Sequence, residues 1–278
     1  MQLPTFRKTV ITLVKATVVL FALFYLLGVY VTLQPLDPPD EVSLDFSGLS
    51  TIAIFGASGT AGDGILKAAM ADPDVETIHV ITRRPTPRIE AGVASGKVKM
   101  TQHMDYLDYS TLQDILAEIR TVYWAIGISA LGVDEETYRR IHVDFPAQFL
   151  EEWLSVTSAD DLSFQFISSS DISEDSDTMW IREKIRAEKT LFALAEGTGL
   201  RVIAHRPDYI GPAKGEAHVG QMILYWFFRP VGAAVRSTDI GRAMLEVTVR
   251  DSQFENGSKL NTRSIHRYAT AYRERTGQ

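Results

Sequence analysis

The chain of 278 residues contains no cysteine. This excludes disulfide bonds, thiolate catalysis and cysteine-ligated metals, although it leaves the compartment open, because secreted proteins can also lack cysteine. Basic residues are in deficit, with 28 Lys and Arg against 35 Asp and Glu and a formal net charge of −7. A nucleic-acid-binding domain needs a basic face, so this balance predicts no nucleic-acid partner.

Two further chemistries lack their sequence patterns. The six histidines show neither the H-x-x-x-H nor the H-E-x-x-H spacing, which predicts no metal site. The glycine-rich run that ends in "GTAGD" has no lysine of the Walker type after its glycines, which argues against phosphoryl transfer.

One hydrophobic run is long enough to cross a membrane. Residues 16–33 carry no charge, and as a helix these 18 residues rise about 27 Å, close to the thickness of a bilayer core. We expect a tail at residues 1–8 and a transmembrane signal anchor at residues 9–33. A cleaved signal peptide is the alternative, but the run exceeds a usual apolar region and no small-x-small cleavage site precedes Pro35.

The rest of the chain predicts one α/β domain. An acidic, proline-rich linker at residues 34–48 leads into residues 49–278, where short apolar runs alternate with longer amphipathic ones, typical of a doubly wound parallel sheet. The stretch "MILYWFF", residues 222–228, is too short to span a membrane; we interpret it as a buried helix or pocket wall, with a position at the membrane surface as the alternative. The expected strands are residues 51–55, 77–81, 97–102, 121–126, 163–167, 201–204 and 259–260.

A glycine motif follows the first expected strand. Gly56, Gly59 and Gly62 stand where the strand "TIAIF" turns into a helix, in the order in which a Rossmann fold uses glycines for a tight turn, for approach to a pyrophosphate and for close helix packing. The context predicts dinucleotide binding rather than a plain glycine-rich turn. Ser58 and Thr60 of the same loop are further candidate cofactor-binding residues.

The end of the second expected strand indicates which dinucleotide is bound. An acidic residue there would favour NAD, whereas this chain has Arg83 and Arg84 in "ITRRP". Guanidinium groups suit a ribose 2′-phosphate, so the sequence predicts NADP(H) as cofactor, with a solvated arginine pair as the alternative.

With these motifs the chain resembles the atypical short-chain dehydrogenases, NmrA-like, and within them the branch of the Tat-interacting protein. The resemblance depends on "GASGTAGDGIL", "ITRRP", "AIGIS", "HVDFPAQFL", "FISSSDIS", "REKIRAEKTL", "HRPDYIGP", "STDIGRAML" and "NTRSIH" in this order. It implies a Rossmann domain with a small C-terminal substrate region. It also implies that Asp105 lies near the adenine, that residues 125–127, including Gly127, line the ribose side, and that Pro207 lies against the nicotinamide.

The catalytic set of that superfamily is only partly present. Its serine is matched within Ser168 to Ser170, and its lysine by Lys184, but the tyrosine position four residues before the lysine holds Trp180. On one helix face a lysine lowers the pKa of a tyrosine so that the phenol donates a proton, whereas an indole does not ionise near neutrality. Our candidate catalytic residues are Ser169, Trp180 and Lys184, and Lys184 is also a candidate cofactor ligand.

Three functions remain compatible with these residues. The first is an NADP-dependent oxidoreductase that acts on a lipophilic small molecule, with its proton from Ser169 or Ser170, Asp171 or Tyr209. The second is a non-redox isomerase or cyclase that reuses the cofactor cleft. The third is an NADP(H)-sensing or scaffold protein without turnover. The sequence gives no indication of the oligomeric state.

The charges around the anchor predict its orientation. Arg7, Lys8 and Lys15 lie before or at the start of the run, whereas no Lys or Arg follows it until Lys67, so the positive-inside rule places the N-terminus in the cytosol. The "NGS" sequon at Asn256 is usable only on the lumenal side. We therefore expect a single-pass protein of the endoplasmic reticulum with a lumenal domain; the commonly cytosolic location of NADPH-linked enzymes argues for the opposite orientation.

Overall fold

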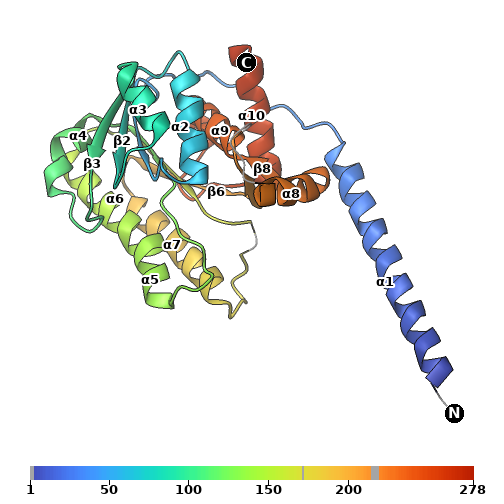
Figure 1. The fold of residues 1–278 in the computed structure, drawn as a ribbon. Coiled ribbons are helices and arrows are strands. Elements are labelled where there is room, and N and C mark those ends of the chain that lie inside the picture. The colour runs from blue at the N-terminus through green and yellow to red at the C-terminus, as the bar shows by residue number, and fades with distance from the viewer. Residues whose placement is uncertain (1–2, 171, 214–218) are drawn as a thin grey trace.

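The computed structural model describes residues 3–170, 172–213 and 219–278 and shows one α/β domain with a helix projecting from it (Figure 1). Seven parallel strands form the main sheet in the order β3-β2-β1-β4-β5-β6-β9, the order of a Rossmann fold extended by one strand. These strands are β1 (Thr51–Phe55), β2 (Thr77–Thr82), β3 (Val98–Gln102), β4 (Thr121–Trp124), β5 (Leu162–Ile167), β6 (Leu200–Arg206) and β9 (Lys259–Asn261).

All seven expected strands are confirmed, with shifts at their ends. The strand β4 ends at Trp124 and not at the expected residue 126. Only the amide of Ala125 still bonds the neighbouring strand, at the oxygen of Phe55, 2.9 Å away. The chain leaves the sheet there to line the cleft described below. Two short strands, β7 (Tyr209–Gly211) and β8 (Ala234–Arg236), pair separately and were not expected.

Helices cover both faces of the sheet, as the doubly wound fold class predicts (Figure 1). Each face has its own apolar core, because parallel strands are buried on both sides. One core is formed with α2 (Thr60–Ala71), α3 (Pro87–Ala94), α9 (Ser237–Val249) and α10 (Thr262–Thr276). The other is formed with α4 (Gln113–Glu118), α6 (Phe145–Val156) and α7 (Met179–Ala195), with α5 (Glu135–Arg139), the 3₁₀ turn η1 (Ser110–Leu112) and the π-helical turn η2 (Arg140–Asp144) beside it.

The second core is rich in aromatic rings at the end of the sheet where the glycine loop lies. Phe55 stacks on Trp124 and meets Phe149 edge-on, with 4.7 Å between ring centroids in both pairs. Such pairs add about 0.5–1.5 kcal/mol beyond the burial of their area. The aromatic cluster therefore holds the ends of β1 and β4, and the loops that follow them, in fixed positions.

The linker lies against the domain. Arg250 and Gln253, in and next to the 3₁₀ turn η4 (Asp251–Gln253), donate to the carbonyl oxygen of Asp40 at 3.0 and 2.9 Å. The amide of Asp45 donates to Val249 at 2.9 Å. These contacts fix the position at which the first helix leaves the domain.

The first helix, α1 (Leu3–Thr32), projects from the domain (Figure 1). Its stretch Thr9–Thr32 has a mean hydropathy of 2.4 and none of it is buried. This is long and apolar enough to cross a bilayer, as a membrane anchor or a signal sequence does. Beside the C-terminal end of α1 lie α8 (Val219–Phe228) and the 3₁₀ turn η3 (Arg229–Val231).

The sequence interpretation of α8 as a buried helix is wrong for most of its side chains. Tyr225 is buried, but Ile223 and Trp226 are 64% and 52% exposed, and Leu224 and Phe227 are exposed as well. The physical reason is that the domain packs against one side of α8 only, where Tyr225 fits against Gly211.

Candidate functional site

The glycine loop between β1 and α2 has the geometry that the sequence predicted. Gly56 has a φ of +79°, and a Cβ there would lie 2.5 Å from the backbone of Ala125. A Cβ on Gly62 would lie 2.1 Å from the oxygen of Gly56. Gly59 is the N-cap residue of α2, so the first-turn amides of this helix, which have no partner within the helix, lie at the end of the glycine loop. Anions bind at such a helix N-terminus, so the loop can hold a pyrophosphate.

A cavity of about 320 Å³ opens beside this loop. It brings together six of the predicted cofactor-binding residues, Gly56, Ser58, Gly59, Arg83, Arg84 and Gly127. The other lining residues are Thr82, Tyr106, Ala125, Ile126, Ile128, Ile141 and Phe145. Thr60, also predicted, lines an adjoining cavity of about 230 Å³ on the other side of the loop.

The turn after β2 presents two guanidinium groups to the cavity. The hydroxyl of Thr82 donates to the backbone oxygen of Arg84 at 2.9 Å, and the side-chain amide of Gln102 donates to the backbone oxygen of Arg83 at 3.1 Å. These two hydrogen bonds fix the backbone of the turn. Both arginines are exposed, and neither forms an ion pair with any residue that the structure describes. Their donors are therefore available to an anionic ligand.

One wall of the cavity is aromatic, and the sequence analysis missed it. Tyr106 is buried and its ring lies 5.5 Å from that of Phe145. Burial raises the pKa of Tyr106, so it stays neutral and serves as a flat apolar surface. Asp105, predicted to lie near the adenine, is exposed, and its carboxylate accepts from the amide of Leu107 at 3.0 Å. The residue after it, not Asp105 itself, lines the cavity.

His142 supports the loop after β4. Its Nε2 lies 3.2 Å from both the backbone nitrogen and the backbone oxygen of Ile128, and its ring leaves no room for a side chain at Gly127. Burial, with the nearby charge of Lys184, lowers the pKa of His142 to about 3. The imidazole is therefore neutral at physiological pH and acts as a fixed support for the loop.

Lys184 lies next to the serine run. Its Nζ donates to the carbonyl oxygen of Ile167, 3.1 Å away, directly before Ser168. Trp180 lies one turn earlier on α7, on the same face of the helix, and is partly exposed. Burial lowers the pKa of Lys184 to about 8, against the opposing effect of Glu188.

The three serines have different surroundings. Ser168 donates to Glu188 at 2.6 Å, and Glu188 is itself buried and held by Arg206 at 2.8 Å. Ser170 is bonded to Asp208 through its hydroxyl. Among the described residues, Ser169 alone of the three has a hydroxyl without a hydrogen-bond partner. This leaves Ser169 as the serine whose hydroxyl is free for a ligand.

The other predicted residues lie around the same edge of the sheet. Pro207 is buried at the end of β6, and its oxygen accepts from the amide of Ser170 at 3.2 Å. The Tyr209 hydroxyl donates to the oxygen of Gln221 in α8 at 3.3 Å, so it is engaged in holding that helix. Asp171, a candidate proton donor, lies outside the described residues.

Because Lys184 is buried, its charge should reduce the stability of the fold. A lysine held at a pKa of about 8 instead of 10.5 costs roughly 3 kcal/mol below pH 8, and the cost disappears as the pH rises towards 10.5, where the unfolded chain also loses its proton. After the lost hydrogen bond is counted, Lys184→Met should stabilise the chain by about 2 kcal/mol at about pH 7 and by almost nothing at about pH 10.

Thermal unfolding of the full chain in detergent at the two pH values measures this difference. Lys189→Met is the matched control, because Lys189 lies on the same helix but is exposed. A destabilised Lys184→Met variant near neutrality, or a gain that does not change with pH, would contradict the assignment of a buried ammonium group.

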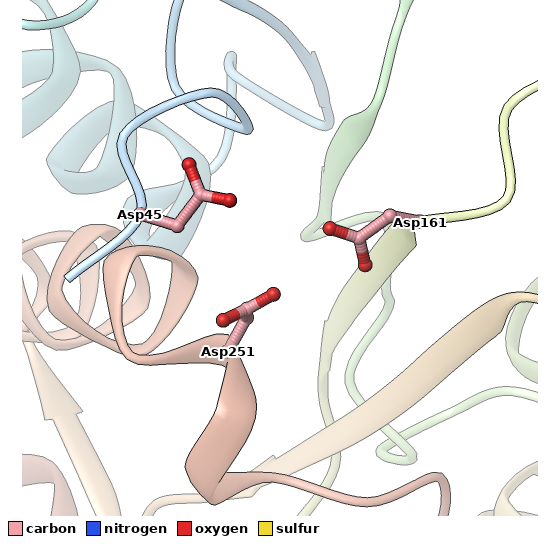
Figure 2. A group of neighbouring side chains, drawn as sticks. All are labelled: Asp45, Asp161 and Asp251. Atoms are coloured by element: carbon pink, nitrogen blue, oxygen red, sulfur yellow. The ribbon is translucent and has the colours of Figure 1, made fainter. Parts of the chain in front are cut away.

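A second cluster of polar side chains lies at the opposite end of the sheet. Figure 2 shows the carboxyl groups of Asp45, Asp161 and Asp251 facing one another, with one oxygen of each within 4.8 Å of the others. The guanidinium of Arg201 pairs with Asp161 and lies 3.1 Å from Asp251. A cation of the chain itself thus occupies this cluster, which fastens the linker to the sheet.

Sequence comparison does not assign the chain to a family. No family model matches the chain. One curated relative, leucinostatins biosynthesis cluster protein T of Purpureocillium lilacinum, is 26% identical over 145 residues, which are 51% of each chain. The chain therefore spans about half the length of the curated relative that it matches.

Solved structures match over more of the chain. A short-chain dehydrogenase/reductase family oxidoreductase from Burkholderia thailandensis aligns with a TM-score of 0.62 at 17% identity, over 76% of this chain and 90% of that one. The NADPH-dependent 3-quinuclidinone reductase of Rhodotorula rubra aligns with 0.62 at 14% identity, over 84% and 98%. The UDP-glucuronic acid 4-epimerase of Bacillus cereus, solved with NAD, aligns with 0.56 at 17% identity, over 76% and 77%. The chain thus has the Rossmann fold of the short-chain dehydrogenases and reductases.

Proposed function

We propose that the protein is a membrane-anchored, NADP(H)-binding oxidoreductase of short-chain dehydrogenase type that acts on a lipophilic small molecule. The observation that carries the proposal is the pair Arg83 and Arg84, which lines the cavity beside the glycine loop without an ion-pair partner among the described residues. The two guanidinium groups suit the 2′-phosphate of NADP. The turn after β2 contains no acidic side chain that would repel this phosphate.

The remaining residues fit a dinucleotide. The amides at the start of α2 would hold the pyrophosphate, and the walls formed by Tyr106, Ile126 and Phe145 would bind the adenosine half. When bound, the cofactor supplies a hydride to a carbonyl carbon or takes one from an alcohol. Ser169 and Lys184 would then hold the substrate oxygen and the nicotinamide half at the ends of β5 and α7.

Trp180 favours a second candidate function, binding of NADP(H) without turnover. A tyrosine at this position would give a proton to the substrate oxygen, and the indole of Trp180 donates a hydrogen bond but no proton near neutrality. Turnover would then need another proton donor, for which Ser169, Asp171 and a water molecule are candidates. A non-redox isomerase or cyclase, which would use the same cleft without hydride transfer, is the remaining alternative.

The lipophilic substrate is inferred from location. An enzyme that α1 tethers to a bilayer meets molecules that partition into it, such as terpenoids, sterols or polyketides. The curated relative is named for a leucinostatin biosynthesis cluster, which supports a role in the biosynthesis of a secondary metabolite.

The full chain in lipid nanodiscs, mixed with NADPH and a panel of lipophilic ketones and enones, tests the function. Loss of NADPH absorbance with formation of a reduced product supports the oxidoreductase. Saturable NADPH binding with an unchanged panel supports the sensor or scaffold. Conversion of a panel member to an isomer while NADPH is retained supports the isomerase or cyclase.

We further propose a lumenal domain, and the sequon provides a test. Asn256 is bonded at both ends of its side chain, to the oxygen of Phe192 at 2.9 Å and the amide of Val202 at 3.3 Å, so Asn256→Gln would disturb the loop. Ser258→Ala removes the sequon and keeps these two bonds. We expect a mobility shift upon glycosidase treatment of the wild-type chain that Ser258→Ala abolishes. No shift, together with protease digestion of the domain outside sealed microsomes, would place the domain in the cytosol.

A further inference from the structure

The helix α8 presents an apolar face that the α/β domain does not cover. Ile223 is 64% exposed and Trp226 52%, and Leu224 and Phe227 are exposed beside them, whereas the other side of α8 is fixed to the domain through Tyr225. Scattered exposed apolar residues are normal, but four on one helix form a contiguous patch of the kind that marks an interaction site.

This patch is continuous with the predicted membrane anchor. The hydroxyl of Tyr25 in α1 donates to the carbonyl oxygen of Phe227 at 3.0 Å, and the two rings lie 5.8 Å apart. One turn further along α1, Gly28 lies so close to Val231 of η3 that a Cβ there would be 3.0 Å from the Val231 side chain. The C-terminal end of α8 therefore packs directly on α1.

The contact with Tyr25 fixes how far the C-terminal end of α8 lies from the end of α1. Tyr25 precedes Thr32, the last residue of the apolar helix, by seven residues, which at 1.5 Å per residue corresponds to about 10 Å along α1. An interfacial helix buries its apolar face about 5–10 Å into the boundary of headgroups and acyl chains. If α1 spans a bilayer and ends near Thr32, the end of α8 lies at that depth.

Cations lie at the level where headgroups would be. Arg263 donates to the oxygen of Val31 at 3.4 Å, at the end of α1. Arg229 follows α8 directly, and its guanidinium lies 5.7 Å from the centre of the Trp226 ring. An apolar face bordered by tryptophan and arginine is the pattern of a segment at a membrane surface, where the cations meet lipid phosphates.

We propose that α8 is a second membrane-contacting element, which lies in the leaflet beside the C-terminal end of α1 with Ile223, Leu224, Trp226 and Phe227 in lipid. The inference rests on the anchor in the proposed function. The helix also reaches the cleft, because Gln221, in its first turn, lines the 230 Å³ cavity together with Ser58 and Thr60 of the glycine loop.

The absence of cysteine makes the test simple, because single cysteines can be introduced into the natural sequence and spin-labelled. The full chain is placed in nanodiscs of phosphatidylcholine and phosphatidylserine. The accessibility of each label to oxygen, which partitions into lipid, is compared with that to a water-soluble nickel chelate. Ile223→Cys is the test position, Phe24→Cys on α1 is the lipid control, and Leu131→Cys, 90% exposed in the loop between β4 and α5, is the aqueous control.

We expect the label at position 223 to favour oxygen over nickel several-fold, like that at position 24, and the label at position 131 to favour nickel. A label at 223 that behaves like that at 131, while 24 remains in lipid, overturns the inference and leaves the anchor standing. If the label at 24 is also aqueous, the anchor and the inference both fail. Dipolar broadening at 223 that is lost upon dilution with unlabelled chain would assign the patch to a second copy and also overturn the proposal.

Discussion

Trp180→Tyr is expected to raise NADPH-dependent reduction of test ketones by about 10²–10⁴-fold, the usual contribution of a positioned general acid. Position 180 lies one helical turn before Lys184, so a phenol there would share a helix face with the ammonium group. The pKa of Lys184, lowered to about 8 by burial, leaves it charged at neutral pH, where it favours the phenolate and so makes the phenol a better acid. Initial rates of NADPH consumption measure the gain.

Two matched variants isolate the cause of this gain. Trp180→Phe opens similar space without a hydroxyl and should leave the rate at background. Lys184→Met added to Trp180→Tyr should remove most of the gain, because nothing then stabilises the phenolate. If Trp180→Tyr stays at background while NADPH still binds, the cleft has been adapted to non-redox work, and the alternative functions replace the oxidoreductase.

Replacement of both Arg83 and Arg84 by alanine should weaken NADPH binding by about 10- to 150-fold, which corresponds to about 1.5–3 kcal/mol for a lost charge-assisted phosphate contact. Affinity for NADH should change little, because NADH has no 2′-phosphate. Both side chains are exposed. The side chains of Thr82 and Gln102 hold the turn through backbone oxygens that the alanines retain, so the double variant should fold normally.

Titration of the full chain in detergent with each cofactor measures the effect. Arg120→Ala is the control, since Arg120 is also exposed but precedes β4 at the opposite end of the sheet. An equal loss of affinity for both cofactors would show that the arginines stabilise the loop and do not read the phosphate.

The local features of the sequence were sufficient to predict the framework of the site. The strand "TIAIF" and the spacing of Gly56 and Gly62 predict a tight turn in which the start of the helix approaches the end of the strand, and the structure confirms it. The position of Arg83 and Arg84 beside the cavity was predicted as well, because they directly follow β2 in the sequence. Strand order and the covering of both sheet faces follow from the fold class.

Residues 125–127 were expected to line the cavity and do so, but its aromatic wall was not predicted, because it comes from distant segments. Tyr106 and Phe145 pair across 39 residues of sequence, and His142 supports a loop that lies 14 residues before it. Nothing in the local pattern distinguishes these residues from ordinary core residues. The same limit explains the error at α8, whose apolar composition predicts a buried helix although the domain covers only the side that carries Tyr225.

Parallel titrations of the full chain with NADPH and NADH test most directly whether the cavity between the glycine loop and Arg83 and Arg84 binds NADP(H), as we propose. We expect saturable binding of both cofactors, with NADPH bound tighter by about 10-fold or more, because its 2′-phosphate adds one charge-assisted contact. Equal affinity for the two cofactors, or no binding of either, would contradict this proposal.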